Sequence, residues 1–281
     1  MIINIYQVSY DTARPDWRMG GGPGHLLRGG LEDALRGQGH TLTVTRIDSA
    51  DPFPSEIKTA FELYGRLADS IRAADSSAFP LVLSGNCGAA LGTLGGISSE
   101  ETGIAWFDAH GDFNTPETTA SGFLDGMGLA AASGLCWQKL TAAIPGFRPI
   151  PGRQIVHIGG SDVETEEAGL MRAYRVQAAS LAEIRANGVA DALYPALSAV
   201  QAQVNSVYLH LDLDVLDPVR TPANHFPSNG GLSVAEAKEA IRLVRERFTV
   251  LAVGVASYDP AYDPNGHTLR AAIELVQAAA G

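Results

Sequence analysis

The chain has 281 residues, of which 46% are hydrophobic and 7% aromatic, so it can bury a sizeable core and does not resemble a disordered chain. Lys and Arg total 20 against 31 Asp and Glu, which gives a net charge of −11. This charge repels nucleic acid and anionic membranes on average. The apolar run at the N-terminus is too short for a signal or a membrane span. We therefore expect a cytoplasmic protein without nucleic-acid or membrane partners, whose two cysteines, Cys87 and Cys136, are thiols.

Seven short apolar runs alternate with helical patterns along the chain. The runs are rich in Val, Ile and Leu and mostly do not alternate with polar residues, which is typical of strands covered on both faces; they span 2–8, 42–47, 81–83, 104–107, 155–158, 207–213 and 250–255. Helices are predicted over 54–74 and over 233–248, where Ser233 and Glu236 form a capping pattern. The sequence predicts one domain over 1–281, a three-layer α/β/α fold with a mainly parallel sheet of about eight strands.

Two of these runs end in clusters of side chains that can bind metals. The clusters are DAHGD at 108–112 and DLD at 212–214. Alternate residues of each cluster point to one side if strand geometry continues, and we expect Gly111 to allow the turn that returns Asp112 to that side. Carboxylates that converge in a low-dielectric site cannot all stay ionised without cations. Oxygen ligands with one imidazole suit Mn²⁺ or a similar divalent ion, and two such ions can share carboxylates.

Five motifs together resemble one enzyme family. They are SGNCG at 84–88, DAHGDFNTP at 108–116, ASGFLDGM at 120–127, SDVETEE at 161–167 and HLDLDVLDP at 210–218. The chain is similar to the arginase/agmatinase/formiminoglutamase family of binuclear manganese ureohydrolases. The resemblance implies an arginase/deacetylase-like fold, manganese-dependent hydrolysis of C–N bonds in linear amidines, and a possible homotrimer or homohexamer.

The resemblance also implies a set of six ligands for two Mn²⁺ ions. In this set Asp108 and Asp212 bridge both ions, His110 and Asp214 complete one, and Cys87 and Asp112 complete the other. The usual family motif has histidine where this chain has Cys87, and aspartate where it has Asn86. A thiolate is softer than imidazole and carries a negative charge, so we expect weak or partial manganese occupancy beside Cys87.

Four further positions match those that contact substrate in the family. Asn114 and Ser121 match residues that hydrogen-bond the α-carboxylate of the substrate in arginases. Glu164 stands where arginases use an aspartate for the α-amino group, and Glu167 lies close to it in sequence. The resemblance therefore implies that the substrate is a whole α-amino acid and not a decarboxylated amine.

Two departures from the family concern the reacting end of the substrate. Asp125 replaces a histidine credited with proton shuttling, and Ser257 replaces a glutamate that pairs with the guanidinium. A guanidinium is always charged and favours a carboxylate, whereas an N-hydroxyguanidine can bind neutral. We therefore expect Nω-hydroxy-L-arginine to be cleaved to L-ornithine and hydroxyurea, as by hydroxyarginine hydrolases of antibiotic biosynthesis. Asp112 is expected to carry a proton to the leaving amine, and Asp125 to assist proton exchange with solvent. His225 is an alternative for that exchange, although a histidine in such a loop is more often a surface residue.

Three alternatives stay open at this point. The first is hydrolysis of L-arginine to ornithine and urea. The second makes Cys87 a nucleophile that forms a covalent amidino-enzyme, which requires a histidine base. The third is a metal-binding pseudoenzyme, suggested by the altered residues at 87, 125 and 257.

Overall fold

A parallel sheet of eight strands forms the centre of the molecule. The computed structural model describes residues 1–50, 55–97, 101–226 and 228–281. The strands of the sheet are β1 (Ile2–Val8), β4 (Thr41–Arg46), β5 (Phe79–Ser84), β6 (Thr102–Phe107), β7 (Ile155–Ile158), β8 (Gln177–Ala179), β9 (Ser206–Asp212) and β10 (Thr249–Ala256). They lie in the order β4-β1-β5-β10-β9-β6-β7-β8, and every neighbouring pair is parallel. A separate two-stranded hairpin joins β2 (Tyr10–Asp11) to β3 (Arg14–Pro15).

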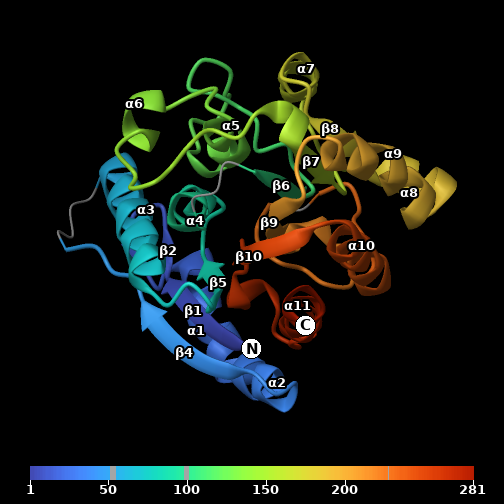
Figure 1. Cartoon of the computed structure of the whole chain (residues 1–281). Helices are drawn as coiled ribbons and strands as arrows, with labels where there is room; N and C mark the ends of the chain where they lie inside the picture. The colour runs from blue at the N-terminus through green and yellow to red at the C-terminus, as the bar shows by residue number, and fades with distance from the viewer. Residues whose placement is uncertain (51–54, 98–100, 227) are drawn as a thin grey trace.

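Helices cover both faces of the sheet, and each face has its own hydrophobic core (Figure 1). One core includes α3 (Glu56–Ala73), α4 (Ala89–Ile97), α5 (Gly128–Ala132) and α7 (Thr165–Ala173), and α6 (Gln138–Thr141) lies near them. The other includes α1 (Gly22–Leu26), α2 (Glu32–Gly37), α8 (Leu181–Asn187), α9 (Val189–Gln201), α10 (Val234–Arg247) and α11 (His267–Ala280). None of the described helices is long and apolar enough to cross a membrane.

The predicted three-layer α/β/α fold is confirmed. Each of the seven apolar runs is a strand of the sheet, and the eighth strand, β8, has only three residues and was not predicted. The helix predicted over 54–74 is α3, although residue 54 lies outside the described residues. Ser233 caps α10. Its hydroxyl accepts a hydrogen bond from the Glu236 amide, and the Glu236 carboxylate accepts one from the Ser233 amide.

The order of the strands brings the predicted site together. The neighbours β5, β10, β9 and β6 occupy the middle of the sheet, so their carboxyl ends lie at one edge. Ligands of parallel α/β proteins bind at this edge. Each of the four strands is followed by, or ends in, a candidate site residue: Cys87, Ser257, Asp212 and Asp108.

The segment after β5 packs so closely on α3 that Gly88 has no room for a side chain. A Cβ at Gly88 would lie 2.1 Å from the Tyr64 hydroxyl oxygen. The tyrosine side chain is buried, so this contact fixes the position of the segment that carries Cys87.

We predict that Gly88→Ala lowers the free energy of unfolding by about 1–3 kcal/mol because the added methyl group overpacks this contact. Urea denaturation followed by circular dichroism measures the change. Adding Tyr64→Phe should recover part of the loss. As a control, Gly37→Ala in α2 meets no atom within 4 Å and should change stability by less than about 1 kcal/mol. Equal losses in both alanine variants would contradict the close contact.

Candidate metal centre

The two carboxylate clusters and Cys87 converge at the carboxyl edge of the central strands. Three groups of side chains each offer ligand atoms within 4.8 Å of one another: Cys87, Asp108 and Asp112; Asp108, His110 and Asp214; and Cys87, His210 and Asp212. All six residues predicted as metal ligands therefore lie in one cluster. Asp108 and Cys87 each belong to two of the three groups, and Asp108 and Asp212 lie at the ends of the adjacent strands β6 and β9.

Short-range hydrogen bonds set the direction of the two central carboxylates. One oxygen of Asp108 accepts from the His110 amide at 2.8 Å, and the other accepts from the Trp106 indole at 2.9 Å. Asp212 accepts from the Asp214 amide at 2.9 Å and caps the short 3-10 helix η5 (Leu213–Val215). In each cluster the first aspartate thus bends the chain just past the strand and presents the residue two places on to the site.

The turn at the end of the DAHGD segment is made by a different residue from the one predicted. Asp112 itself adopts a left-handed backbone, with φ of 48°, whereas Gly111 has no positive φ. Gly111 is required for another reason, because a Cβ there would lie 2.8 Å from the Glu167 carboxyl carbon. The Asp112 carbonyl is fixed by the amides of Leu129 and Ala130, both at 3.0 Å. A non-glycine residue held in this conformation is strained, and such strain concentrates at functional sites.

Burial and mutual repulsion dominate the electrostatics of the centre. Burial, reinforced by Asp214, raises the pKa of Asp108 to about 6. Burial, reinforced by neighbouring carboxylates, also raises the pKa of Asp112 and of Asp212 well above the ordinary value. Although burial favours a neutral ring, hydrogen bonds to Asp108 and Asp214 raise the pKa of His110 to about 12. The site therefore favours positive charge strongly.

The donor set fits two divalent cations. One carboxylate oxygen of Asp112 is buried and has no hydrogen-bond partner among the described residues. Among the six predicted ligands, oxygen donors predominate, with one imidazole from His110 and one sulfur from Cys87. Asp108 belongs to two of the three groups, and a carboxylate shared between neighbouring sets of ligand atoms suits two metals held about 3.5–4 Å apart.

Cys87 is hydrogen-bonded to the carboxylate that it would share a metal with. Its Sγ donates to Asp212 Oδ2 at 2.8 Å, and the same oxygen accepts from the Ser257 hydroxyl at 2.5 Å. Burial, with Asp212 next, raises the pKa of the Cys87 thiol well above its ordinary value. The group is therefore a neutral thiol unless a cation replaces its proton.

These contacts disfavour Cys87 as a nucleophile. The histidine that shares a group of ligand atoms with Cys87 is His210, whose ring stacks on Trp106 with centroids 3.7 Å apart and whose Nδ1 meets the Tyr208 hydroxyl at 2.9 Å. Burial lowers the pKa of His210 to about 3, which makes it a poor base. A thiol surrounded by carboxylates and lacking a competent base does not form the thiolate that covalent catalysis needs.

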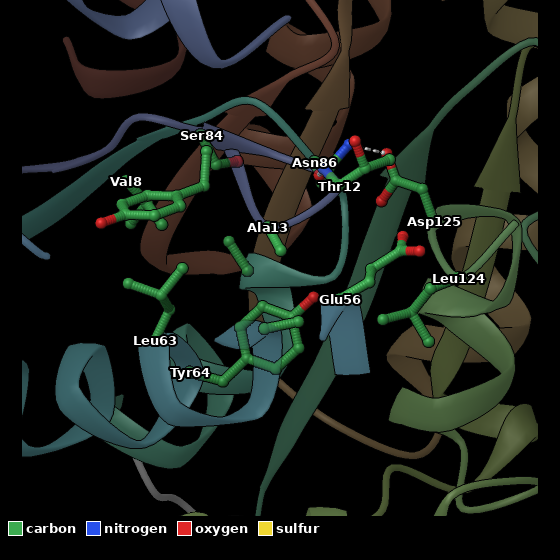
Figure 2. Close-up of a pocket in the computed structure, with 13 residues that line it drawn as sticks. Val8, Thr12, Ala13, Glu56, Leu63, Tyr64, Ser84, Asn86, Leu124 and Asp125 are labelled. Atoms are coloured by element: carbon green, nitrogen blue, oxygen red, sulfur yellow. Dashed lines mark hydrogen bonds between the residues drawn. The ribbon is translucent and has the colours of Figure 1, made fainter. Parts of the chain in front are cut away.

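Asp125 supports the segment around Cys87. Its carboxylate accepts from the Asn86 side-chain amide at 2.8 Å and from the Gly88 backbone amide at 3.1 Å, so it holds both neighbours of Cys87. Burial raises the pKa of Asp125 to about 7. The residue borders the pocket above the metal cluster and also a small cavity of about 20 Å³ on the other side, whose walls include Glu56 (Figure 2).

The four predicted substrate residues line a pocket of about 260 Å³ that opens above the cluster. Asn114 donates to Glu164 at 3.2 Å, whereas the Ser121 hydroxyl is exposed. Glu167 differs from the other three, because its two oxygens accept from the backbone amides of Phe113 and Glu164 at 2.9 and 3.1 Å. Glu167 therefore fixes the loop that carries the others.

Sequence reasoning did not identify Asn224 or the placement of His210. Asn224 is buried in the pocket wall and donates to Asp214 at 3.3 Å and to the Ser257 carbonyl at 3.0 Å. It follows no recognisable spacing. His210 lies two residues before Asp212. Because alternate residues of a strand point to the same face, the sequence could have placed His210 on the same side as Asp212.

The structure places His225 outside the three groups of ligand atoms and outside the pocket lining. Its Nδ1 lies 2.7 Å from an Arg18 guanidinium nitrogen.

Comparison with known proteins assigns this α/β/α fold and its carboxylate centre to a class of hydrolases that cleave C–N bonds of amidines. The chain matches the arginase family over residues 5–281. It is 31% identical to the arginase of Bacillus caldovelox over 224 residues, 78% of this chain and 75% of that protein. It is 32% identical to the arginase of Brevibacillus brevis over 206 residues, 72% of this chain and 69% of that protein.

Solved structures agree with the sequence matches. Arginase from Bacillus subtilis superposes with a TM-score of 0.90 at 26% identity, covering 100% of this chain and 99% of that chain. The chain belongs to the arginase family, and it is an amidinohydrolase of that family.

We predict that Asp212→Asn abolishes stoichiometric metal binding and reduces turnover by at least about a thousandfold, because it removes a carboxylate that is expected to bind both metals. Elemental analysis after dialysis against manganese measures the first effect, and ornithine release measures the second. Asp162→Asn is the matched control, because Asp162 lies in the same pocket wall but outside the cluster. Wild-type metal content in Asp212→Asn would contradict the assignment.

Proposed function

We propose that this amidinohydrolase cleaves the guanidino group of an arginine-like α-amino acid and that its preferred substrate is Nω-hydroxy-L-arginine, with L-ornithine and hydroxyurea as products. The observation that carries the preference is the contact of Ser257, which places a neutral hydroxyl at the bottom of the pocket and donates it to Asp212. A permanently charged guanidinium gains no carboxylate partner from Ser257, whereas a neutral N-hydroxyguanidine needs none. The reaction would correspond to that of the hydroxyarginine hydrolase in D-cycloserine biosynthesis.

The proposal includes two manganese ions. Asp108 and Asp212 would bridge them, His110 and Asp214 would complete one, and Cys87 and Asp112 would complete the other. When bound, the ions supply the Lewis acidity that makes water a nucleophile near neutral pH. The carboxylates of the chain fix their positions.

Protein groups then handle the proton and the leaving group. Asp112 has one buried oxygen without a protein partner, and its side chain lines the pocket, so it is placed to accept a proton from the attacking water. The same carboxyl group returns the proton to the ornithine side-chain nitrogen as the C–N bond breaks. Asp125 has both oxygens engaged by Asn86 and Gly88, and its contribution is to hold the Cys87 segment beside the reacting atoms, with exchange of protons with solvent as a secondary role.

The outer part of the pocket would bind the amino-acid end of the substrate. Asn114, Ser121 and Glu164 lie there together, and they offer an amide, a hydroxyl and a carboxylate. These groups match the needs of an α-carboxylate and an α-ammonium group. We further propose that the enzyme acts on free amino acids in the cytoplasm, as a homotrimer or homohexamer.

Hydrolysis of L-arginine to ornithine and urea is the second candidate function. It is favoured by the names of the relatives, which are arginases. Because residue 257 is a serine, a carboxylate from another residue would have to pair with the guanidinium. Asp125 is a candidate, because it borders the pocket and contacts the Cys87 segment.

We predict that the manganese-loaded enzyme has a kcat/KM for Nω-hydroxy-L-arginine at least about tenfold above that for L-arginine, which corresponds to about 1.4 kcal/mol of transition-state stabilisation. Ornithine release under anaerobic conditions measures both substrates. Ser257→Glu should shift the ratio toward L-arginine by restoring a carboxylate. A preference for L-arginine in the wild type would overturn the specificity, and metal-loaded enzyme that releases no ornithine from either substrate would support a pseudoenzyme.

We predict that Cys87→His raises the manganese content of dialysed enzyme from below two ions toward two per chain, because neutral imidazole suits Mn²⁺ better than a thiolate. Cys136→Ser is the matched control, because the thiol of Cys136 is also buried but lies outside the cluster. Unchanged metal content in Cys87→His would count against direct ligation by residue 87.

A further inference from the structure

The pocket above the metal cluster is lined mainly by polar side chains. The large apolar side chains that line it are Met19, Phe123 and Phe226, and most of the other lining residues are carboxylic acids, amides or alcohols. Phe123 follows Ser121 closely in sequence, and Phe226 follows Asn224. The two phenylalanines thus belong to loops that also carry polar residues of the pocket wall, whereas Met19 lies in the 3-10 helix Arg18–Gly21.

The two phenylalanines meet each other. Their ring centroids lie 5.3 Å apart with an interplanar angle of 31°. Phe123 comes from the loop that follows β6, and Phe226 comes from the loop that follows β9 and η5. Phe226 is 36% exposed, so the pair lies where the pocket opens to solvent. We call Phe123 and Phe226 the aromatic clamp.

Each half of the clamp is fixed by contacts to polar residues. The Phe123 amide donates to the Ser121 hydroxyl at 3.2 Å. The Phe226 amide donates to Asn224 Oδ1 at 2.7 Å, and the side chain of Asn224 also donates to Asp214. The position of Phe226 is therefore coupled to a candidate metal ligand.

A second set of contacts supports the Phe226 ring. The His225 ring lies on it with centroids 3.8 Å apart, and the Arg18 guanidinium lies 2.7 Å from His225 Nδ1. Arg18 has a positive φ of 49° at the start of η1 (Arg18–Gly21), so the backbone is strained where it makes this contact. Such support holds an exposed aromatic ring in place, which reduces the entropy lost when a ligand packs on it.

We propose that the aromatic clamp determines specificity by packing on the methylene chain of the bound amino acid. This inference rests on the proposed function and adds the residues that select chain length. A ligand with a polar group at each end and an apolar middle matches a pocket whose wall combines many polar groups with a pair of phenylalanines near its opening. Each methylene removed from water strengthens binding, so a chain that reaches the clamp binds more tightly than a shorter one.

The test uses binding, which does not depend on turnover. Isothermal titration of manganese-loaded protein measures Kd for L-ornithine and for L-2,4-diaminobutyrate, which has one methylene fewer. In the wild type, ornithine should bind several-fold more tightly than its shorter homologue, about fourfold for one methylene. Phe226→Ala and Phe123→Ala should each weaken ornithine binding about tenfold and reduce the ratio between the two ligands to less than twofold.

Two further variants control the test. Phe226→Leu keeps an apolar side chain and should give an intermediate Kd, and thermal unfolding shows whether each variant is folded. Val219→Ala, on the same loop but 88% exposed and outside the pocket wall, should bind ornithine as the wild type does. Ornithine binding within twofold of wild type in folded Phe226→Ala and Phe123→Ala overturns the clamp.

The outcome separates the two proposals. If the wild type releases ornithine from Nω-hydroxy-L-arginine and both alanine variants bind ornithine normally, the proposed role of the aromatic clamp is wrong and the proposed function stands. If the wild type cleaves neither guanidino acid but the alanine variants lose ornithine binding and chain-length selection, the clamp stands and the proposed function is wrong.

Discussion

Repulsion between buried carboxylates is the constraint on which this structure depends. Asp108 and Asp212 leave adjacent strands at the same edge of the sheet and are 1% and 3% exposed. Asp112 and Asp214 lie beside them, and each added charge makes ionisation of the next more costly. Parallel strands place these side chains together whether or not a cation is bound, so cation binding offsets a cost that the fold itself creates.

The same constraint explains why Cys87, Asp212 and Ser257 form a unit. A neutral thiol and a neutral hydroxyl both donate to one oxygen of Asp212, which stabilises that carboxylate without adding charge. A thiol that must lose its proton to bind a metal makes occupancy of that site depend on competition between a proton and a cation. The proposed weak manganese affinity and the proposed substrate preference thus both rest on this one local arrangement.

Much of the fold and the metal cluster could be predicted from the sequence because the signals are local. Apolar runs mark strands that are buried on both faces, and residues two apart at a strand end share a side. Strand β8 was missed because its three residues, Gln177–Ala179, include a polar side chain and no branched apolar one. The turn at Asp112 was assigned to Gly111, since sequence shows where glycine occurs but not which residue bears the positive φ.

The wall of the pocket was harder to predict, because its residues meet only through the tertiary fold. Asn224, Phe123 and Phe226 lie in loops without periodic spacing, and the pairing of the two phenylalanines joins segments about a hundred residues apart in sequence. Asn114, Ser121 and Glu164 were placed in advance only through their resemblance to a family.

Anomalous X-ray diffraction at the manganese edge, on crystals soaked in Mn²⁺, tests the central claim most directly. Two manganese ions bound as proposed give two peaks about 3.5–4 Å apart, with Asp108 and Asp212 in contact with both and a lower occupancy at the peak beside Cys87. Active enzyme that shows no anomalous peak between these two aspartates would contradict the central claim.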